Sequence, residues 1–255
     1  MKRTLIAAIL VLAFSAGTFG QFDGLNGPIA KVEKWSYKTE DKSGNIVEVW
    51  DAHSVTMYDV NQNGIESIHY RETGTVDERY IRTFDGSGQL IQVEKYNCFG
   101  NLESKTLYQY EGNVQIKRGY NANGDVDSAS DTELDADGNW ARMTIYDVDS
   151  GAVSSVTENT YTSDGEPLSM KMYTDEGELS ITLDTRYDVE GMDYIITSAI
   201  YLLGSVFMKT ESGTRIIETD KHGNWTEQRS YEYKERFGKT EWFLTNIYRR
   251  EITYR

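Results

Sequence analysis

The stretch FDGSGQLIQVEKYNCFGNL, residues 84–102, holds two turn-like segments on either side of one short strand-like segment. FDGSG and YNCFG concentrate Asp, Asn, Ser and Gly, which accept positive φ or hydrogen-bond their own backbone. The segment that follows alternates in character and places these residues on one face: Leu102, Ser104, Thr106, Tyr108 and Tyr110. A period of two between such turns predicts a strand with one face more buried than the other.

This unit recurs along most of the chain. From Gly88 to Gly191 the turn glycines follow one another at steps of 12, 12, 12, 14, 13, 14, 12 and 14 residues. An aromatic residue often lies four positions before the glycine, and an apolar residue often lies two positions after it. Regular spacing of this length predicts strand, turn, strand, turn, which is an antiparallel meander.

The strand faces carry few apolar side chains, since only 38% of the 255 residues are apolar and the commonest aromatic residue is Tyr, with 18 copies. We therefore expect an all-β fold in which repeated hairpins form an elongated, twisted sheet that can wrap on itself. A β-sandwich or a barrel is the alternative. The expected organisation is a single β-repeat domain over residues 21–255. It has regular repeats at about 35–230 and an aromatic C-terminal hairpin at about 227–255.

The chain opens with MKRTLIAAILVLAFSAGTFGQ. Lys2 and Arg3 precede an apolar run, and Thr18 and Gly20 stand at −3 and −1 of a cleavage site before Gln21. This pattern is typical of a secretory signal peptide, residues 1–20. It predicts an exported protein that is periplasmic, on the outer surface or extracellular. The alternative interpretation is a buried N-terminal helix or a membrane anchor.

The composition limits the partners. The formal net charge is −15, from 41 acidic and 26 basic residues. An acidic chain repels phosphate backbones and anionic lipid headgroups, so we expect no nucleic acid partner and no stable membrane insertion after signal cleavage. Cys98 is the only cysteine and has no internal disulfide partner.

The most apolar stretch is YIITSAIYLLGSVFM, residues 194–208. Thr197, Ser198 and Gly204 interrupt it, and it is too short to span a bilayer. It predicts two fully buried strands around a bend. The alternative is an adhesive face for a partner or a membrane.

No group of residues indicates a reaction. Asp59 begins a segment like the first half of a calcium loop, and so does Glu133. The closing Glu of such a loop is missing, because its position holds Tyr70 and Thr144 respectively. The histidines are far apart in the sequence, and no nucleophile elbow, phosphate loop or dinucleotide fingerprint is present. We therefore expect no enzyme activity, no catalytic residue, no cofactor and no metal site. A hydrolase that uses two of the many carboxylates on an elongated β scaffold is the alternative.

Several segments resemble a known repeat. YDVNQNG (58–64), FDGSGQL (84–90), YNCFGNL (96–102) and YDVEG (187–191) resemble the YD repeats of Rhs-type proteins, and their spacing is similar to that of MORN-like variant repeats. The resemblance implies β-hairpins stacked into extended or wrapping sheets, which serve as shells, carriers or binding surfaces without catalytic residues of their own. The chain is shorter than large Rhs proteins and has no toxin-like tail, so a cage around cargo is not expected.

The hexamer D-x-x-G-N-W occurs twice, as DADGNW (135–140) and DKHGNW (220–225). Each copy has the register of a hairpin turn, with Trp where other repeats have Leu or Val. If the chain has a ligand-binding face, we expect it to contain Trp140, Tyr146, Trp225 and Tyr231. The alternative is that these aromatics fill the buried face. The predicted function is a non-catalytic binding or scaffold module of the bacterial cell envelope, with a glycan or an envelope protein as partner.

Overall fold

The computed structural model describes residues 25–255 except 43–44, 190, 203 and 237–238. The predicted signal peptide lies outside the described residues. Regular secondary structure in the described part of the chain consists of sixteen strands. They are β1 (Ile29–Lys42), β2 (Asn45–Tyr58), β3 (Gly64–Tyr70), β4 (Val76–Phe84), β5 (Leu90–Asn97), β6 (Leu102–Glu111), β7 (Val114–Asn121), β8 (Val126–Leu134), β9 (Trp140–Tyr146), β10 (Val153–Tyr161), β11 (Pro167–Thr174), β12 (Leu179–Val189), β13 (Met192–Leu202), β14 (Ser205–Thr219), β15 (Trp225–Arg236) and β16 (Lys239–Tyr254).

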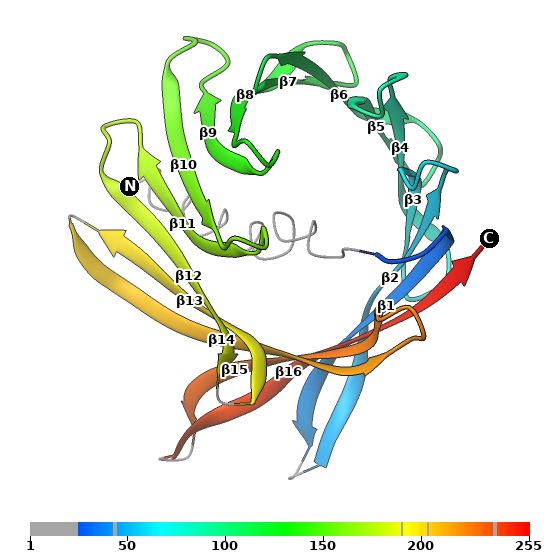
Figure 1. The fold of residues 1–255 in the computed structure, drawn as a ribbon, viewed down its shortest axis with the longest axis vertical. Coiled ribbons are helices and arrows are strands. Elements are labelled where there is room, and N and C mark those ends of the chain that lie inside the picture. Colours follow the sequence, from blue (N-terminus) through cyan, green and yellow to red (C-terminus); the bar gives the residue numbers. More distant parts are fainter. Residues whose placement is uncertain (1–24, 43–44, 190, 203, 237–238) are drawn as a thin grey trace.

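The strands form a closed antiparallel barrel (Figure 1). Each strand pairs with its neighbours in sequence, and β1 pairs with β16 from Ile29↔Tyr254 to Lys38↔Asn246. The predicted all-β meander of hairpins is confirmed, and the barrel named as the alternative is the form that it takes. Closure pairs the two edges that an open sheet would leave exposed, so no strand edge remains unpaired along this seam.

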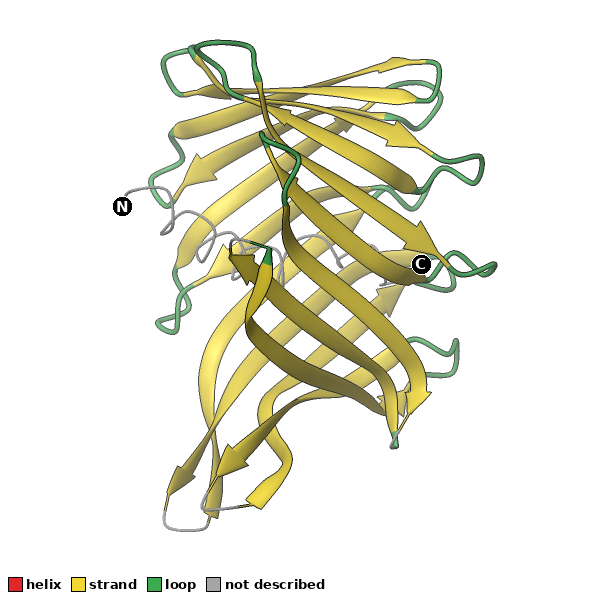
Figure 2. Cartoon of the chain, turned by 90° about the vertical axis from the view of Figure 1, so that its left-hand side faces the viewer, coloured by secondary structure: helices red, strands yellow, loops and turns green. Residues whose placement is uncertain are grey.

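The turns form two groups, because successive turns of an antiparallel meander lie at opposite ends of the barrel (Figure 2). We call one end the terminal end. It holds the turns that follow even-numbered strands, together with residues 25–28 and Arg255. The other end, which holds the turns that follow odd-numbered strands, is the far end. Both copies of D-x-x-G-N-W follow even-numbered strands, β8 and β14, and therefore lie at the terminal end.

The turns are built as the sequence predicts. In the turn after β4, the amide of Gly88 donates to the carbonyl of Asp85, and Gly88 has a φ of 88°. The Asp85 carboxylate accepts hydrogen bonds from the amides of Ser87 and Gln89. Asp135 and Asp220 accept the equivalent bonds in the two D-x-x-G-N-W turns. This is a type I turn followed by a glycine in the left-handed region, which suits a three-residue hairpin loop.

The apolar stretch 194–208 is only partly buried, so the prediction of two fully buried strands is wrong: β13 is mostly half-buried and its continuation in β14 is exposed. Ile195 and Ala199 on β13 are buried, whereas Val206 and Phe207 on β14 are 55% and 72% exposed. The physical reason is position. The bend at Gly204 is a hairpin tip at the far end, and residues 205–210 lie beyond the part of β14 that pairs with β15.

Candidate binding site on the inward face

The wall of the barrel has two rows of side chains with different exposure. Along β8–β12 one row is buried: Ser130, Thr132, Thr157, Met170, Met172, Ile181, Leu183 and Thr185. The other row contains the buried Thr182 but is otherwise marked by charged, exposed side chains: Arg142, Glu158, Lys171, Asp184 and Arg186. Because side chains converge on the concave side of a barrel, we assign the buried row to the lumen and call it the inward face.

Pairing register extends the inward face around the wall to β2–β7. Ser130 is opposite Lys117, which is opposite Tyr108. On the same face, Lys95 is opposite Tyr80, and Tyr80 is opposite Ser67. Four tyrosines therefore line this part of the lumen: Tyr58, Tyr80, Tyr108 and Tyr110.

The outward face is rich in ion pairs. Arg118 lies 3.0 Å from the carboxylate of Asp131, and Arg186 lies 3.4 Å from that of Glu211. Arg249 bridges Glu48 and Glu227, at 2.7 Å and 3.1 Å. Such exposed pairs stabilise a fold only slightly. They nevertheless make the outward face hydrophilic at these positions, which lie on β2, β7, β8, β12, β14, β15 and β16.

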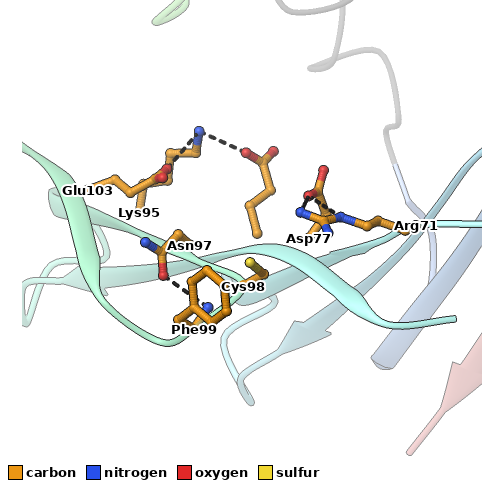
Figure 3. Close-up of a pocket in the computed structure, with 8 residues that line it drawn as sticks. Arg71, Asp77, Lys95, Asn97, Cys98, Phe99 and Glu103 are labelled. Carbon is orange, nitrogen blue, oxygen red and sulfur yellow. Dashed lines mark hydrogen bonds and ion pairs between the residues drawn. The ribbon is translucent and has the colours of Figure 1, made fainter. Parts of the chain in front are cut away.

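A pocket of about 310 Å³ opens between the far-end turns after β3 and β5 (Figure 3). Lys95 is one of the residues that line it and lies 2.8 Å from Glu78 and 3.2 Å from Glu103. The Tyr80 hydroxyl donates to Glu78 at 2.9 Å, and the ammonium of Lys95 lies 6.0 Å from the centre of the Tyr80 ring. These residues form the Lys95 cluster: Glu78, Tyr80, Lys95 and Glu103.

The pocket is also lined by Arg71, Asp77, Asn97, Cys98 and Phe99. The Arg71 guanidinium is 2.7 Å from Asp77. Phe99 is 85% exposed, so an exposed aromatic ring and polar side chains line the same pocket. A pocket with hydrogen-bonding groups beside an aromatic face is suited to a ligand with both hydroxyl groups and C–H surfaces.

The electrostatics of the cluster keep its groups in fixed protonation states. Burial raises the pKa of Tyr80 to about 12, and the hydrogen bond to Glu78 acts in the same direction. Burial also works to raise the pKa of Glu78, but the hydrogen bonds from Lys95 and Tyr80 outweigh it and hold that pKa below its usual value. Hydrogen bonding to Glu78 raises the pKa of Lys95. At neutral pH the cluster is therefore a carboxylate–ammonium–phenol network.

The four residues expected to form a ligand face do not lie together. Trp140 and Trp225 both follow a terminal-end turn, but β10–β14 separate their strands. Tyr146 is at the far end of β9, where its hydroxyl donates to Asp131 on the outward face. Tyr231 pairs with Gly213 and Leu244 in the middle of β15.

Trp225 is part of the packed structure, as the alternative interpretation of the aromatics expects. It is 8% exposed, and the guanidinium of Arg250 lies 3.9 Å from the centre of its ring. The Lys34 ammonium lies 5.3 Å from the same ring. Trp140 is half-buried, and its carbonyl accepts hydrogen bonds from the side chains of Asn159 and Tyr161.

Sequence reasoning missed the Lys95 cluster. Glu78, Lys95 and Glu103 belong to three strands, and only the hairpin register brings them together. The available signal was the alternation of β4, which places Glu78, Tyr80 and Arg82 on one face. Within the described residues, no group of three or more His, Cys, Asp or Glu side chains is arranged to hold a metal ion.

No family model matches the chain, and no curated protein matches it. The YD-repeat resemblance therefore stays a resemblance. No helix in the described part of the chain has the length and hydrophobicity of a membrane span.

Among solved structures, the chain is similar to a porin-like protein from Bacteroides uniformis, with 11% identity and a TM-score of 0.44 over 90% of this chain and 99% of that one. It also matches part of the Tc holotoxin pore of Photorhabdus luminescens, with 11% identity and a TM-score of 0.20. A TcdB2–TccC3–Cdc42 complex matches with 10% identity and a TM-score of 0.19. The chain covers only 13% and 15% of those two toxin chains. Likeness at this level assigns neither a family nor a function.

Proposed function

We propose that the chain is a non-catalytic, exported β-barrel of the bacterial cell envelope that binds a glycan in the Lys95 pocket. The observation that carries the proposal is the Lys95 cluster beside the exposed ring of Phe99. Glycans are bound by fixed polar groups that hydrogen-bond hydroxyls and by aromatic rings that stack on C–H faces, and the pocket offers both.

The cluster favours binding over hydrolysis. A carboxylate-based hydrolase needs one carboxylic acid with a raised pKa beside an ionised partner. Glu78 and Glu103 are both held on the ammonium of Lys95, and the hydrogen bonds to Glu78 keep its pKa low. A protonated Glu78 is therefore disfavoured at neutral pH.

The outward face supports an aqueous or periplasmic location rather than insertion into a bilayer. A barrel that spans a membrane presents an apolar band to the lipid, and charged groups there are destabilising. Here the outward positions carry the pairs Arg118–Asp131, Arg186–Glu211 and Arg79–Glu66. The leader-like sequence at residues 1–20 supports export.

The test is calorimetric titration of the full chain with neutral trisaccharides: cellotriose, maltotriose, mannotriose and chitotriose. We expect Lys95→Met and Phe99→Ala each to weaken binding of the bound member by about tenfold. Lys105→Met is the matched control, because Lys105 lies on the outward face of the neighbouring strand β6. Absence of binding to every member, or equal loss in the control, would contradict the proposal.

An envelope protein is the second candidate partner. The β13–β14 hairpin exposes Leu202, Val206, Phe207 and Met208 at the far end. Exposed apolar groups that are adjacent in space are typical of protein contacts. Site-specific crosslinking from position 207 in intact cells would test this, with position 216 on the same strand as control. Equal crosslinking from both positions would argue against a specific contact.

A further inference from the structure

Two cations on the inward face lack an acidic partner. Arg82 on β4 donates to the hydroxyl of Ser67 at 2.8 Å and to the carbonyl of Gly64 at 3.4 Å, both of which are neutral acceptors. Lys117 on β7 takes part in no ion pair found among the described residues. Lys95, on the same wall, is held between two carboxylates. The protein neutralises one of these three cations and not the other two.

The charges of Arg82 and Lys117 are therefore only poorly compensated. Burial lowers the pKa of Lys117, and no neighbouring acid opposes it. Burial also lowers the pKa of Arg82, against a weaker opposing effect of Tyr58, Tyr108 and Tyr80. Half-buried cations without an acid partner are costly, and the cost is removed when an anion binds them. Acidic residues are abundant in the chain, which has 41 of them, yet none is paired with Arg82 or Lys117 among the described residues.

Tyr108 lies between the two cations. It is directly opposite Lys117 in the β6–β7 pairing, and it is close enough to Arg82 to influence its pKa. These three side chains are nearer the terminal end of the barrel, whereas the Lys95 pocket is at the far end. A guanidinium, an ammonium and a phenol together present several hydrogen-bond donors on one wall, which suits an oxyanion.

We propose that the inward face of β4–β7 binds the oxyanion of an acidic saccharide between Arg82, Tyr108 and Lys117. The inference rests on the proposed glycan-binding function and specifies the ligand class. A uronic acid carboxylate and a sulfate ester share the chemistry that these groups recognise. The neutral part of the ligand then lies along the tyrosines toward Lys95.

The experiment is calorimetric titration of the full chain with trigalacturonate, its neutral methyl ester, a sulfated galactotriose and unsulfated galactotriose. We expect at least one acidic ligand to bind about tenfold more tightly than its neutral counterpart. Arg82→Gln and Lys117→Gln should each reduce this preference, and the double variant should abolish it. Arg142→Gln is the control, since Arg142 is an exposed cation on the outward face of β9. The two acidic arms distinguish a carboxylate from a sulfate.

A second measurement does not depend on the folding of the variants. Affinity of the unaltered chain for the acidic ligand should fall as NaCl is raised, while affinity for the neutral ligand should not. Equal affinity for acidic and neutral ligands, or a preference that survives in the double variant, would overturn the inference and leave the glycan-binding function standing. Absence of binding to all four probes would overturn the inference, and with the neutral trisaccharide panel also negative, the proposed function would fall as well.

Discussion

At the residue scale, two copies of the same short motif have different roles. Asn139 and Asn224 occupy the same place in the two D-x-x-G-N-W turns, and each side-chain amide donates back to the turn Asp. The tryptophans that follow differ in burial, because Trp225 lies beneath Arg250 and Lys34, whereas Trp140 is half-buried at the rim. Position in the barrel, not the motif, decides what each tryptophan does.

The first prediction concerns this pair. Trp225→Leu should lower the free energy of unfolding by about 2–4 kcal/mol, because it removes a buried ring and uncovers two cations. Trp140→Leu should cost less than about 1.5 kcal/mol, because the ring is half-exposed. Urea denaturation followed by circular dichroism measures both. Equal losses in the two variants would show that Trp140 is as much a part of the core as Trp225.

At the scale of elements, the turn between β14 and β15 is hydrogen-bonded to the segment that precedes β1. The side-chain NH2 group of Asn224 donates to the carbonyl of Asn26 at 2.9 Å, and its side-chain oxygen accepts from the backbone amide of Asn26 at 2.7 Å. Asn224 also contacts the hydroxyl of Tyr254 at 2.7 Å and is 1% exposed. One side chain therefore joins the β14–β15 turn, the segment before β1 and the end of β16.

Gln62 supports the same seam from the β2–β3 turn. It has a φ of 67°, a left-handed conformation in which the other turns place glycine. Its side-chain oxygen accepts a hydrogen bond from the amide of Ile29 at 2.8 Å. A glycine here would relieve the backbone cost but would remove this hydrogen bond across the seam, so that the Ile29 amide would keep only the carbonyl of Gly27 as its acceptor.

The second prediction tests the seam with a matched pair of variants. Asn224→Ala should lower the free energy of unfolding by about 2–3 kcal/mol more than Asn139→Ala, since Asn224 is buried and has hydrogen-bond partners outside its own turn, Asn26 and Tyr254. The two variants remove the same hydrogen bonds within the turn, so the difference isolates the seam. Equal losses in chemical denaturation would show that the Asn26 and Tyr254 contacts add nothing to stability.

At the scale of the whole molecule, the stability should depend on acid pH. Hydrogen bonds within the turns hold the pKa values of Asp59, Asp85, Asp135 and Asp147 below their usual value of 3.8. A carboxyl with a depressed pKa in the folded state contributes stability that is present above its unfolded pKa. That contribution is lost as the pH falls through the folded pKa.

The third prediction follows from the direction of these pKa shifts. The thermal midpoint should change little between about pH 7 and pH 5 and should fall below about pH 4, as the turn carboxylates become protonated. Relief of repulsion in a chain of net charge −15 acts in the opposite direction. A midpoint that rises on acidification would show that relief of this repulsion outweighs the stability lost when the turn carboxylates are protonated. Differential scanning calorimetry across the pH range measures the balance.

Much of the fold was predictable because its determinants are local. A turn such as residues 85–89 needs only its own Asp and Gly, and the alternating segments between turns need only their period of two. The sequence therefore predicts strands, turns and antiparallel order. It does not predict whether the meander stays open, because closure depends on how the twist accumulates until β16 meets β1.

The candidate site was not predictable, because its parts are joined across strands. Glu78, Lys95 and Glu103 meet through two hairpin registers, and Arg82 and Lys117 share a face only because the strands between them are paired in sequence order. The tryptophans were candidates because they are large and rare residues. Residue type alone, however, does not show whether a side chain faces the lumen or the outside of a barrel. By itself the sequence determined the repeated hairpin, since that depends on backbone preferences within a few residues. Only the tertiary structure decided the closed barrel and its inward face, since these depend on contacts between residues far apart in the chain.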